Sequence, residues 1–458
     1  MSKTASPADG LDRQQGIKPV QIVIAGGGFG GVEVARELER ILPRDATVQI
    51  TLVNRENYFL FTPMLHEVAA SDLELTTIVN PLRQLVKRSS VFTGVVESID
   101  VEQRTVQVSH ADGGHTHHLA YDHLVIALGA VTNFHGLPGL AERAHTMKSL
   151  GDAIALRNQL IAHLEEADFD CNSAARSALL TVLVAGGGFA GVETVAAVYD
   201  LLHAARRYYP NVKATDIRVV VVHPGPHLLP ELGEVLGKYT RERLSARGLE
   251  VYLNTRVVGI EGDDVLLSSG ERIATRNLVW TAGTSVNPIL NSIPCRKERG
   301  RVCVEPTLQV PGFPGLWALG DCAAIPDPDG GTYPPTAQHA LREGTLLARN
   351  IAATLRGEPL KPFAFRTIGL LASIGQRKGV AIILGRKFSG FVAWWLWRTI
   401  YLSKLPRLEK KVRVALTWTL DVFFAKDIVQ YATQRAPAMA GDPSSGAASP
   451  PEPSREAM

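Results

Sequence analysis

Apolar residues in this chain fall into short runs that end in glycine, and two of the runs open nearly identical segments. Val23–Glu39 reads VIAGGGFGGVEVARELE, and Val182–Asp200 reads VLVAGGGFAGVETVAAVYD. Each segment is an apolar run, a glycine cluster and a stretch of helix-forming residues, which predicts a strand, a tight turn and a helix. The copies lie about 160 residues apart, which is the length of one domain, so the pattern predicts two domains of one kind.

The elements that follow the two glycine turns also repeat in order. Strand-like segments that form a β-meander come after each helix, and an apolar strand closes each meander: YDHLVIALGA contains Gly129, and LVWTAGT contains Gly283. This order predicts an α/β fold with two Rossmann-like dinucleotide-binding domains that carry β-meander insertions. We expect the first domain to span residues 19–150 and 291–360 and the second to span residues 151–290.

Three glycines of each turn fall on the dinucleotide-binding fingerprint G-x-G-x-x-G. In such a loop the first glycine makes the tight turn, the second lets the backbone approach a pyrophosphate, and the third lets the helix pack closely on the strand. The phosphates then lie at the helix N-terminus, where free N–H groups and the helix dipole favour an anion. A copy that has decayed to a structural repeat is the alternative. The glycines are Gly26, Gly28 and Gly31 in the first loop and Gly186, Gly188 and Gly191 in the second.

Residues at the ends of the apolar strands are the next candidates for nucleotide contacts. An acidic residue usually meets the adenosine ribose at the end of the second strand; here that position is Asn54, with Glu56 as a substitute two residues later. The aromatic segment that follows, which contains Pro63, either holds a ring system or packs on the core as an apolar loop. A later buried strand ends in Gly320 and Asp321. Asp321 is either a ligand for a sugar or ribityl hydroxyl or an ordinary turn residue.

The C-terminal part has a different pattern. Phe388–Leu405 is rich in aromatic and aliphatic residues interrupted by Arg398 and Lys404, and Arg407–Phe424 has apolar residues at helical spacing behind a basic start. Helices with an apolar face, aromatic residues and basic residues suit the plane of an anionic membrane surface. Two helices packed on the protein or on a second subunit are the alternative. We expect residues 361–433 to form an amphipathic, helical membrane-anchoring segment.

Composition narrows the classes of function. The net charge of +3 is too small to argue for nucleic acid. The four cysteines are scattered without a C-x-x-C pair, so neither a disulfide framework nor a dithiol redox centre is indicated. We expect no signal peptide and no membrane-spanning helix, and the histidine-rich stretch at residues 110–118 is typical of a surface turn rather than a metal site. Residues 1–18 and 434–458 are predicted to be disordered.

Together these motifs resemble the type II NADH:quinone oxidoreductases, alternative, non-proton-pumping flavoproteins of the pyridine nucleotide-disulfide oxidoreductase superfamily. The resemblance runs from about Val20 to Tyr431. It implies that the first loop, which includes Phe29 and Gly30, holds the pyrophosphate of FAD, that Asp321 meets the ribityl chain, and that the second loop holds NADH. The motifs that carry it are AGGGFGGV, NYFLFTPMLHEVA, YDHLVIALGA, AGGGFAGVE, LVWTAGT, ALGDCA and PPTAQHALREG, together with the aromatic, basic C-terminal segment.

The resemblance also implies catalytic and quinone-binding residues. Glu193 matches a glutamate near the contact between nicotinamide and flavin. Its alternative is an acidic residue favoured by the helix dipole, since Glu33 occupies the same place in the first copy. Ala337 and Gln338 match the start of an A-Q-x-A-x-Q quinone motif. The resemblance implies that Ala337 also contacts the cofactor and that Gln338 is a catalytic residue. Arg342 stands in place of the last glutamine, still at the quinone site.

Two further departures from the family pattern bear on specificity. Ile368 stands where a lysine is often found, which leaves the quinone headgroup preference open. His223 replaces the glutamate that usually ends the corresponding strand of the second domain and that repels the extra phosphate of NADPH. Discrimination between the two nicotinamides should therefore weaken. No arginine follows to favour NADPH, so we expect NADH.

The resemblance implies a peripheral enzyme on the cytoplasmic face of the cell membrane. NADH would pass a hydride to FAD, and the reduced flavin would pass two electrons to a membrane quinone. A flavin-dependent reductase of a soluble acceptor such as ferredoxin, an enzyme like sulfide:quinone oxidoreductase and a nicotinamide-responsive redox sensor are the alternatives. Sulfide oxidation needs cysteines that reach the flavin, and the chain has none after Cys322. The sequence leaves a homodimer open.

Overall fold

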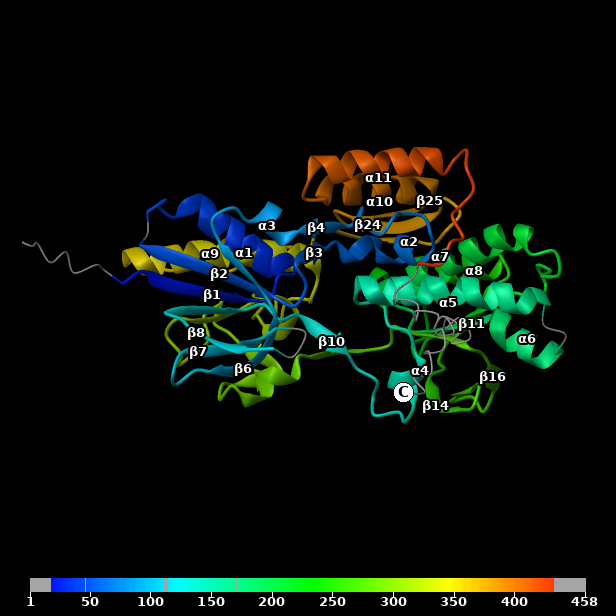
Figure 1. Ribbon diagram of the computed structural model, residues 1–458, viewed down its shortest axis with the longest axis horizontal. Helices are drawn as coiled ribbons and strands as arrows, with labels where there is room; N and C mark the ends of the chain where they lie inside the picture. Colours follow the sequence, from blue (N-terminus) through cyan, green and yellow to red (C-terminus); the bar gives the residue numbers. More distant parts are fainter. Residues whose placement is uncertain (1–17, 46, 111–113, 170–171, 432–458) are drawn as a thin grey trace, which may run out of the picture.

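The computed structural model describes residues 18–45, 47–110, 114–169 and 172–431. The two tails that are predicted to be disordered lie outside these ranges, apart from Lys18. Two α/β units stand side by side along the long axis of the molecule, and the C-terminal helices lie over the junction between them (Figure 1).

The first unit is built on a five-stranded parallel sheet in the order β21-β9-β1-β2-β5. Its central strands are rich in valine, isoleucine and leucine, because a parallel sheet is covered on both faces. The edge strand returns from far along the chain, where Leu316 pairs with Leu124. The strands are β1 (Val20–Ala25), β2 (Val48–Asn54), β5 (Ser90–Thr93), β9 (His123–Ile126) and β21 (Leu316–Ala318), and helices of this unit are α1 (Phe29–Ile41), α3 (Leu82–Leu85) and α9 (Ala337–Arg356).

The second unit repeats this plan in a four-stranded parallel sheet, ordered β13-β12-β11-β17. Its central strand pairs on both sides, and all of its residues are buried. The strands are β11 (Thr181–Ala185), β12 (Arg218–Val222), β13 (Glu250–Tyr252) and β17 (Asn277–Trp280), and the helices are α5 (Leu150–Phe169), α6 (Ser173–Leu180), α7 (Phe189–Ala205) and α8 (Gly233–Ser245).

Each unit also carries a three-stranded antiparallel meander, and a ribbon of two antiparallel strands joins the units. The predicted α/β fold with two Rossmann-like units is confirmed. The histidine-rich stretch lies within the first meander, where His110 and His117 pack against the ring of Phe92; its residues 111–113 lie outside the described ranges. Within the described ranges, no group of His, Cys, Asp or Glu is arranged to hold a metal ion. The meanders are β6 (Val95–Asp100), β7 (Thr105–Ser109) and β8 (Thr116–Ala120), and β14 (Val257–Glu261), β15 (Asp264–Leu267) and β16 (Arg272–Ala274); the ribbon is β10 (Ala130–Thr132) with β18 (Thr284–Val286).

The segment between β2 and β5 connects the parts of the molecule. Its helix α2 packs against α5 and α7 of the second unit and lies beneath the C-terminal helices (Figure 1). Every residue of α2 is buried. The segment contains β3 (Tyr58–Leu60), η1 (Thr62–Met64), α2 (Leu65–Ala69) and β4 (Val79–Pro81); the remaining short elements are α4 (Leu140–Arg143), η2 (Arg206–Tyr208), η3 (Pro230–Leu232), η4 (Pro288–Ser292), β19 (Lys297–Glu298), β20 (Arg301–Cys303), η5 (Gly320–Cys322) and β22 (Ala323–Ala324).

The C-terminal region is a small sheet covered by two helices. The aromatic run read as helix-like from Phe388 begins instead in a strand, and the helix starts only after Gly390, whose φ of 73° favours glycine. Apolar runs as short as these have no periodicity that distinguishes a strand from the start of a helix. The sequence therefore does not predict the sheet. No helix in the described part of the chain is long and apolar enough to cross a membrane. The elements are β23 (Gly369–Ser373), β24 (Gly379–Ile383), β25 (Arg386–Gly390), α10 (Phe391–Lys404) and α11 (Leu408–Leu420).

Candidate active site

The parallel strands of each sheet end at a common edge, and the predicted nucleotide contacts lie along it. In the first unit Gly26 follows β1, Asn54 ends β2 and Gly129 comes shortly after β9. Gly320 and Asp321 come just after β21. Ligands of open α/β sheets bind at this edge. In the second unit the corresponding residues are Gly186 after β11, His223 after β12 and Gly283 after β17.

The turn and packing glycines have the same geometry in both loops. Gly26 has a φ of 115° and Gly186 a φ of 114°, which L side chains rarely adopt. A Cβ added at Gly31 would lie 1.8 Å from the carbonyl oxygen of Gly26, and one at Gly191 would lie 1.8 Å from that of Gly186. Neither position can hold any other residue without moving the backbone. The two loops are therefore one structure that occurs twice.

The middle glycines differ from these because they face open space. A Cβ at Gly28 or Gly188 would meet no atom within 4 Å. Each of these residues is the N-cap of its helix, α1 or α7, and among the described residues no side chain caps the free N–H groups there. Uncapped N–H groups beside an open backbone surface suit a pyrophosphate. Both loops thus fit a dinucleotide.

Asn54 and His223 occupy the positions where an acidic ribose partner is usual. Each accepts a hydrogen bond from the backbone of its glycine loop. The N–H of Gly27 donates to Oδ1 of Asn54 at 2.9 Å, and the N–H of Gly187 donates to Nδ1 of His223 at 3.1 Å. Because Nδ1 accepts a hydrogen bond, the neutral imidazole carries its proton on Nε2. Burial lowers the pKa of His223 and favours this neutral form. The two residues hold the loops in place and offer no carboxylate to a ribose.

The aromatic segment after β2 packs largely on the core. Phe59 and Phe61 are buried, and both rings lie edge-on to Phe29, with ring centroids 4.9 and 5.8 Å away. Pro63, in η1, is half-buried next to them. At Gly30 an added Cβ would lie 2.1 Å from Cδ1 of Leu319, so this glycine sets how closely α1 approaches the end of β21.

The end of β21 brings several charged groups together. The N–H of Gly320 donates to Oε2 of Glu343 at 2.8 Å, and burial raises the pKa of this glutamate to about 7. Burial also raises the pKa of Asp321, against the opposing effect of the cations Lys148 and Arg301. The carboxylate that the resemblance places at the ribityl chain is thus half-buried and partly balanced by positive charge.

The residues of the quinone motif hold the first strand of the C-terminal sheet. Ala337 is the first residue of α9. Nε2 of Gln338 donates to the carbonyl of Gly369 at 3.2 Å, and its Oε1 accepts the N–H of Ile368 at 3.4 Å. The guanidinium of Arg342 lies 4.1 Å above the ring of Phe365. The motif therefore joins α9 to the segment that precedes and begins β23.

Glu193 is buried where α7 meets the C-terminal region. Its Oε1 accepts the indole N–H of Trp397 at 2.9 Å and the N–H of Ser373 at 3.1 Å, and its Oε2 lies 3.7 Å from Nδ1 of His66. Burial raises the pKa of Glu193 to about 8 and lowers the pKa of His66 to about 3. Although their separation is that of an ion pair, both groups are pushed toward their neutral forms, and we interpret the contact as one between neutral side chains.

A second buried acid repeats this arrangement next to the first. Oε2 of Glu67, on α2, accepts the indole N–H of Trp418, on α11, at 3.0 Å. Burial raises the pKa of Glu67 to about 8. The guanidinium of Arg398 lies 4.4 Å from the ring centroids of both Trp394 and Trp418. Two indole–carboxyl pairs thus attach the C-terminal helices to the two nucleotide units.

Comparison with known proteins decides the family. A pyridine nucleotide-disulphide oxidoreductase model matches residues 20–344, and a model of the NDH2 C-terminal domain matches residues 368–427. A type II NADH:quinone oxidoreductase of Mycobacterium tuberculosis is 31% identical over 416 residues, covering 87% of each chain. The chain belongs to the type II NADH:quinone oxidoreductase family. A demethylphylloquinone reductase of Synechocystis is 32% identical over 405 residues, covering 87% of this chain and 95% of that protein.

The fold of this type II NADH:quinone oxidoreductase agrees with that of a solved relative. The structure of NDH2 from Plasmodium falciparum in complex with NADH superposes with a TM-score of 0.84, at 19% identity, and covers 90% of this chain and 100% of that one. Family membership confirms the enzyme class predicted from the sequence, an NADH-dependent flavin oxidoreductase.

Several residues around the site of the type II NADH:quinone oxidoreductase escape sequence reasoning. The buried acids Glu67 and Glu343 lie within two of the family motifs, and the buried indoles of Trp397 and Trp418 lie in the aromatic C-terminal segment, but the sequence assigns none of the four a role. One signal was available: an indole N–H that becomes buried needs an acceptor. That rule implies an acceptor for each tryptophan but does not say which residue supplies it.

Proposed function

We propose that the protein is an NADH dehydrogenase that works through FAD and delivers two electrons to a membrane quinone without pumping protons. The observation that carries the proposal is the pair of glycine loops with one geometry, at the edges of two sheets, in a chain of this family. When bound, FAD supplies the redox chemistry: it takes a hydride from NADH and gives two electrons to the quinone. The chain supplies binding, orientation and a proton.

The two loops divide the nucleotides between them. The first domain, residues 19–150 and 291–360, takes FAD, because Asp321 at the end of β21 can accept hydrogen bonds from ribityl hydroxyls at the same sheet edge. The second domain, residues 151–290, takes NADH at the N-terminus of α7. Gly28 and Gly188 leave the space that the two pyrophosphates need.

Glu193 is assigned as the group that holds a proton for the reaction. Reduction of one quinone by one NADH takes up one proton from the medium, and a buried carboxyl with a pKa of about 8 holds one at neutral pH. Trp397 and Ser373 fix Oε1, which leaves Oε2 directed at His66. Gln338 and Arg342 are assigned to the quinone end of the site, where they hold the segment before β23 in position.

The C-terminal helices are proposed to lie on the cytoplasmic face of the cell membrane. Leu408, Val412, Leu416 and Leu420 follow one another at every fourth position of α11, and each is between 50% and 75% exposed. Such an apolar stripe suits the boundary between headgroups and acyl chains. The basic start of α11 is only partly available to lipid, because Nζ of Lys410 points inward and donates to the carbonyl of Thr76 at 2.6 Å.

Steady-state kinetics test the enzymatic proposal. Purified FAD-loaded protein should oxidise NADH with a short-chain quinone, and Glu193→Gln should slow this turnover while FAD remains bound. Glu142→Gln, a change of an exposed glutamate, serves as the matched control. Turnover with ferredoxin but with no quinone would overturn the acceptor assignment. Light scattering of the same preparation tests the homodimer that the sequence leaves open.

The sulfide-oxidising alternative gains no support from the cysteine next to the proposed ribityl site. Cys322 is fully buried, its thiol donates to the carbonyl of Leu319 at 3.1 Å, and burial raises its pKa to about 12. The nucleophile in thiol chemistry is the thiolate. A thiol held in its protonated form is poorly suited to attack sulfur.

A further inference from the structure

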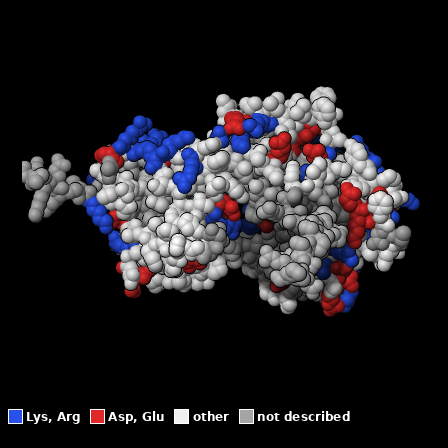
Figure 2. Space-filling model, in the orientation of Figure 1, with Lys and Arg blue, Asp and Glu red and all other residues white. Residues whose placement is uncertain are grey.

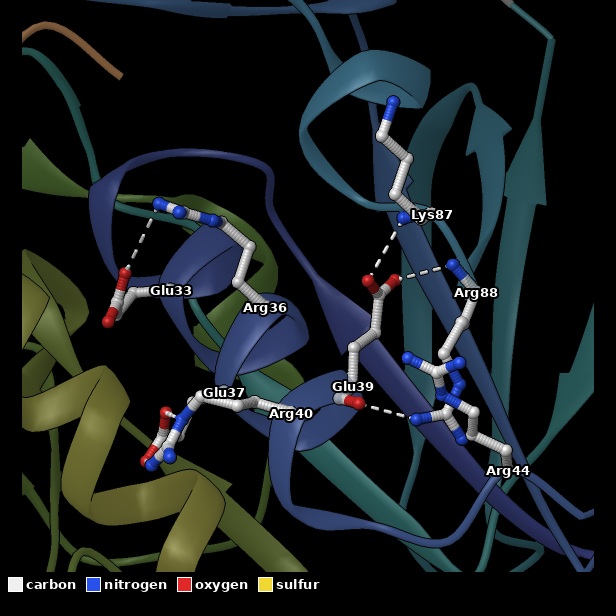
Figure 3. A pocket seen from close by; sticks show the side chains of 8 residues that line it. All are labelled: Glu33, Arg36, Glu37, Glu39, Arg40, Arg44, Lys87 and Arg88. Carbon is white, nitrogen blue, oxygen red and sulfur yellow. Dashed lines mark hydrogen bonds and ion pairs between the residues drawn. The ribbon is translucent and has the colours of Figure 1, made fainter. Parts of the chain in front are cut away.

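A groove on the first unit, away from the sheet edges that hold the loops, is lined by exposed cations. It has a volume of about 790 Å³ and lies between α1 and the segment that follows α3. Figure 3 shows side chains from both segments around it. Five of the residues that line it are cations, and all five are exposed: Arg36, Arg40, Arg44, Lys87 and Arg88. We call this surface the basic groove.

The three acids of the groove are turned inward and already bonded. Glu39 accepts the N–H groups of Lys87, Arg88 and Ser89 at 2.8 to 2.9 Å. Glu37 is 6% exposed and pairs with two arginines, at 2.6 and 2.9 Å. These bonds hold the pKa of both carboxyls below its usual value, so both remain charged and bound.

The third acid, Glu33, is half-buried, accepts the hydroxyl of Thr345 at 3.0 Å and lies 3.9 Å from Arg36. Five cations face solvent, and three acids face the protein. The outer surface of the groove is therefore more positive than its residue count suggests. A surface of this kind attracts phosphate groups.

The position of the groove identifies the source of the phosphates. Figure 2 shows a dense gathering of blue side chains over α1 and α3, and in Figure 1 these helices and α11 lie on the same upper side of the molecule. A bilayer that receives the apolar stripe of α11 would thus also face the basic groove. In Figure 1 the helices α1 and α3 lie lower than α11 on that side, as expected if α11 enters the acyl boundary while the segments that line the groove meet the headgroups.

We propose that the basic groove is a second membrane-contact site, which binds the phosphates of anionic phospholipids and holds the long axis of the enzyme along the bilayer. This inference rests on the proposed membrane association of α11. Two weak contacts on one rigid body strengthen each other, because the second binds at the high effective concentration that the first creates. Each basic residue near an anionic surface strengthens binding roughly fivefold.

The test uses a triple variant that spares the fold. Arg36→Gln, Arg44→Gln and Lys87→Gln remove three exposed charges, whereas Arg40 pairs with a buried acid and Arg88 binds backbone carbonyls of the loop after α1, so both are kept. The control variant changes three other exposed arginines to glutamine. These are Arg256, Arg296 and Arg299, near β14 and β19.

Full-length, FAD-loaded protein is sedimented with vesicles of phosphatidylcholine and with vesicles of equal parts phosphatidylcholine and phosphatidylglycerol. We expect the triple variant to lose roughly a hundredfold in affinity for the anionic vesicles at low salt, to bind neutral vesicles as the unchanged protein does, and to keep its turnover with a soluble quinone. The control variant should lose no more than a few-fold.

Three outcomes would overturn the inference. Equal losses in the triple and control variants would show only a general charge effect. Displacement by inorganic phosphate alone would show a site for a free anion. Unchanged affinity of the triple variant, with normal binding of the parent protein, would show that the basic groove adds nothing to membrane binding by α11. If the parent protein binds no vesicles, the proposed membrane association itself fails, while soluble-quinone turnover still tests the enzymatic proposal.

Discussion

The buried carboxyl of Glu67 should make the protein less stable as the pH rises. Its pKa is 4.5 in an exposed setting and about 8 in the fold, because burial disfavours the charged form. Between these values the folded protein holds a proton that the unfolded chain has lost. Stability is therefore greatest below the lower value and falls as the pH rises toward the higher one, by about 1.4 kcal/mol per pH unit.

The range from pH 6.5 to 8 lies above the opposing titration of His66, and a variant of Glu67 separates its effect from those of the other buried acids. Below pH 6.5 the titration of His66 makes the folded protein more stable as the pH rises, because burial lowers the pKa of His66 from 6.5 in the unfolded chain to about 3 in the fold. Within this range, Glu67 should remove about 2 kcal/mol of stability, and Glu193, whose pKa is also about 8, should remove a similar amount. The charged groups that act on Glu67 are Arg398, Asp72 and Lys426.

Glu67→Gln removes the titration and keeps an oxygen for the indole of Trp418. The FAD-loaded protein and this variant are unfolded in urea at pH 6.5 and at pH 8, with tryptophan fluorescence as the signal. The variant should gain about 2 kcal/mol relative to the parent between the two pH values. Glu102→Gln, at an exposed site, should show no such gain. An equal difference between parent and Glu67→Gln at both pH values would refute the assignment of a protonated buried carboxyl.

Three other predictions concern the nucleotides and the proton-holding acid. Gly188→Val should abolish quenching of flavin fluorescence by NADH but leave the FAD content unchanged, whereas Gly28→Val should yield protein without FAD; loss of both cofactors in both variants would contradict separate loops. His223→Glu should lower the ratio of NADPH to NADH in kcat/KM by about tenfold, because a carboxylate repels the extra phosphate; an unchanged ratio in steady-state assays would show that His223 does not face the ribose. Trp397→Phe removes a hydrogen bond that lowers the pKa of Glu193, so the alkaline limb of the pH–rate profile should move to higher pH, while Trp395→Phe at an exposed position should leave it in place.

The glycine loops were predictable because their constraint acts within a few residues. Gly31 must be glycine to let α1 pass the carbonyl of Gly26, and this requirement is written in the local spacing. The sheet-edge rule likewise brings Asn54 and His223 to the loops, although it does not say that they would bind the loop backbone instead of a ribose.

The indole–carboxyl pairs were not predictable, because they depend on tertiary packing. Trp397 and Glu193 are 204 residues apart in the sequence and meet only when the C-terminal region packs on the second unit. The sequence favours a membrane contact for the aromatic run, with helices packed on the protein as the alternative. The structure divides this run, with Trp397 fully buried and Trp395 54% exposed.

The two tryptophan bonds limit what the C-terminal helices can do at a bilayer. One indole is fixed to α7 of the second unit and the other to α2, in a segment of the first. Drawing either helix into the hydrocarbon would strip a donor from an acid and leave that acid buried without its partner, at a loss of about 1–3 kcal/mol for each bond. The helices therefore cannot work as a detachable tether. In the proposed membrane contact they act as part of one rigid body with the two nucleotide units, and that body sets their depth in the lipid.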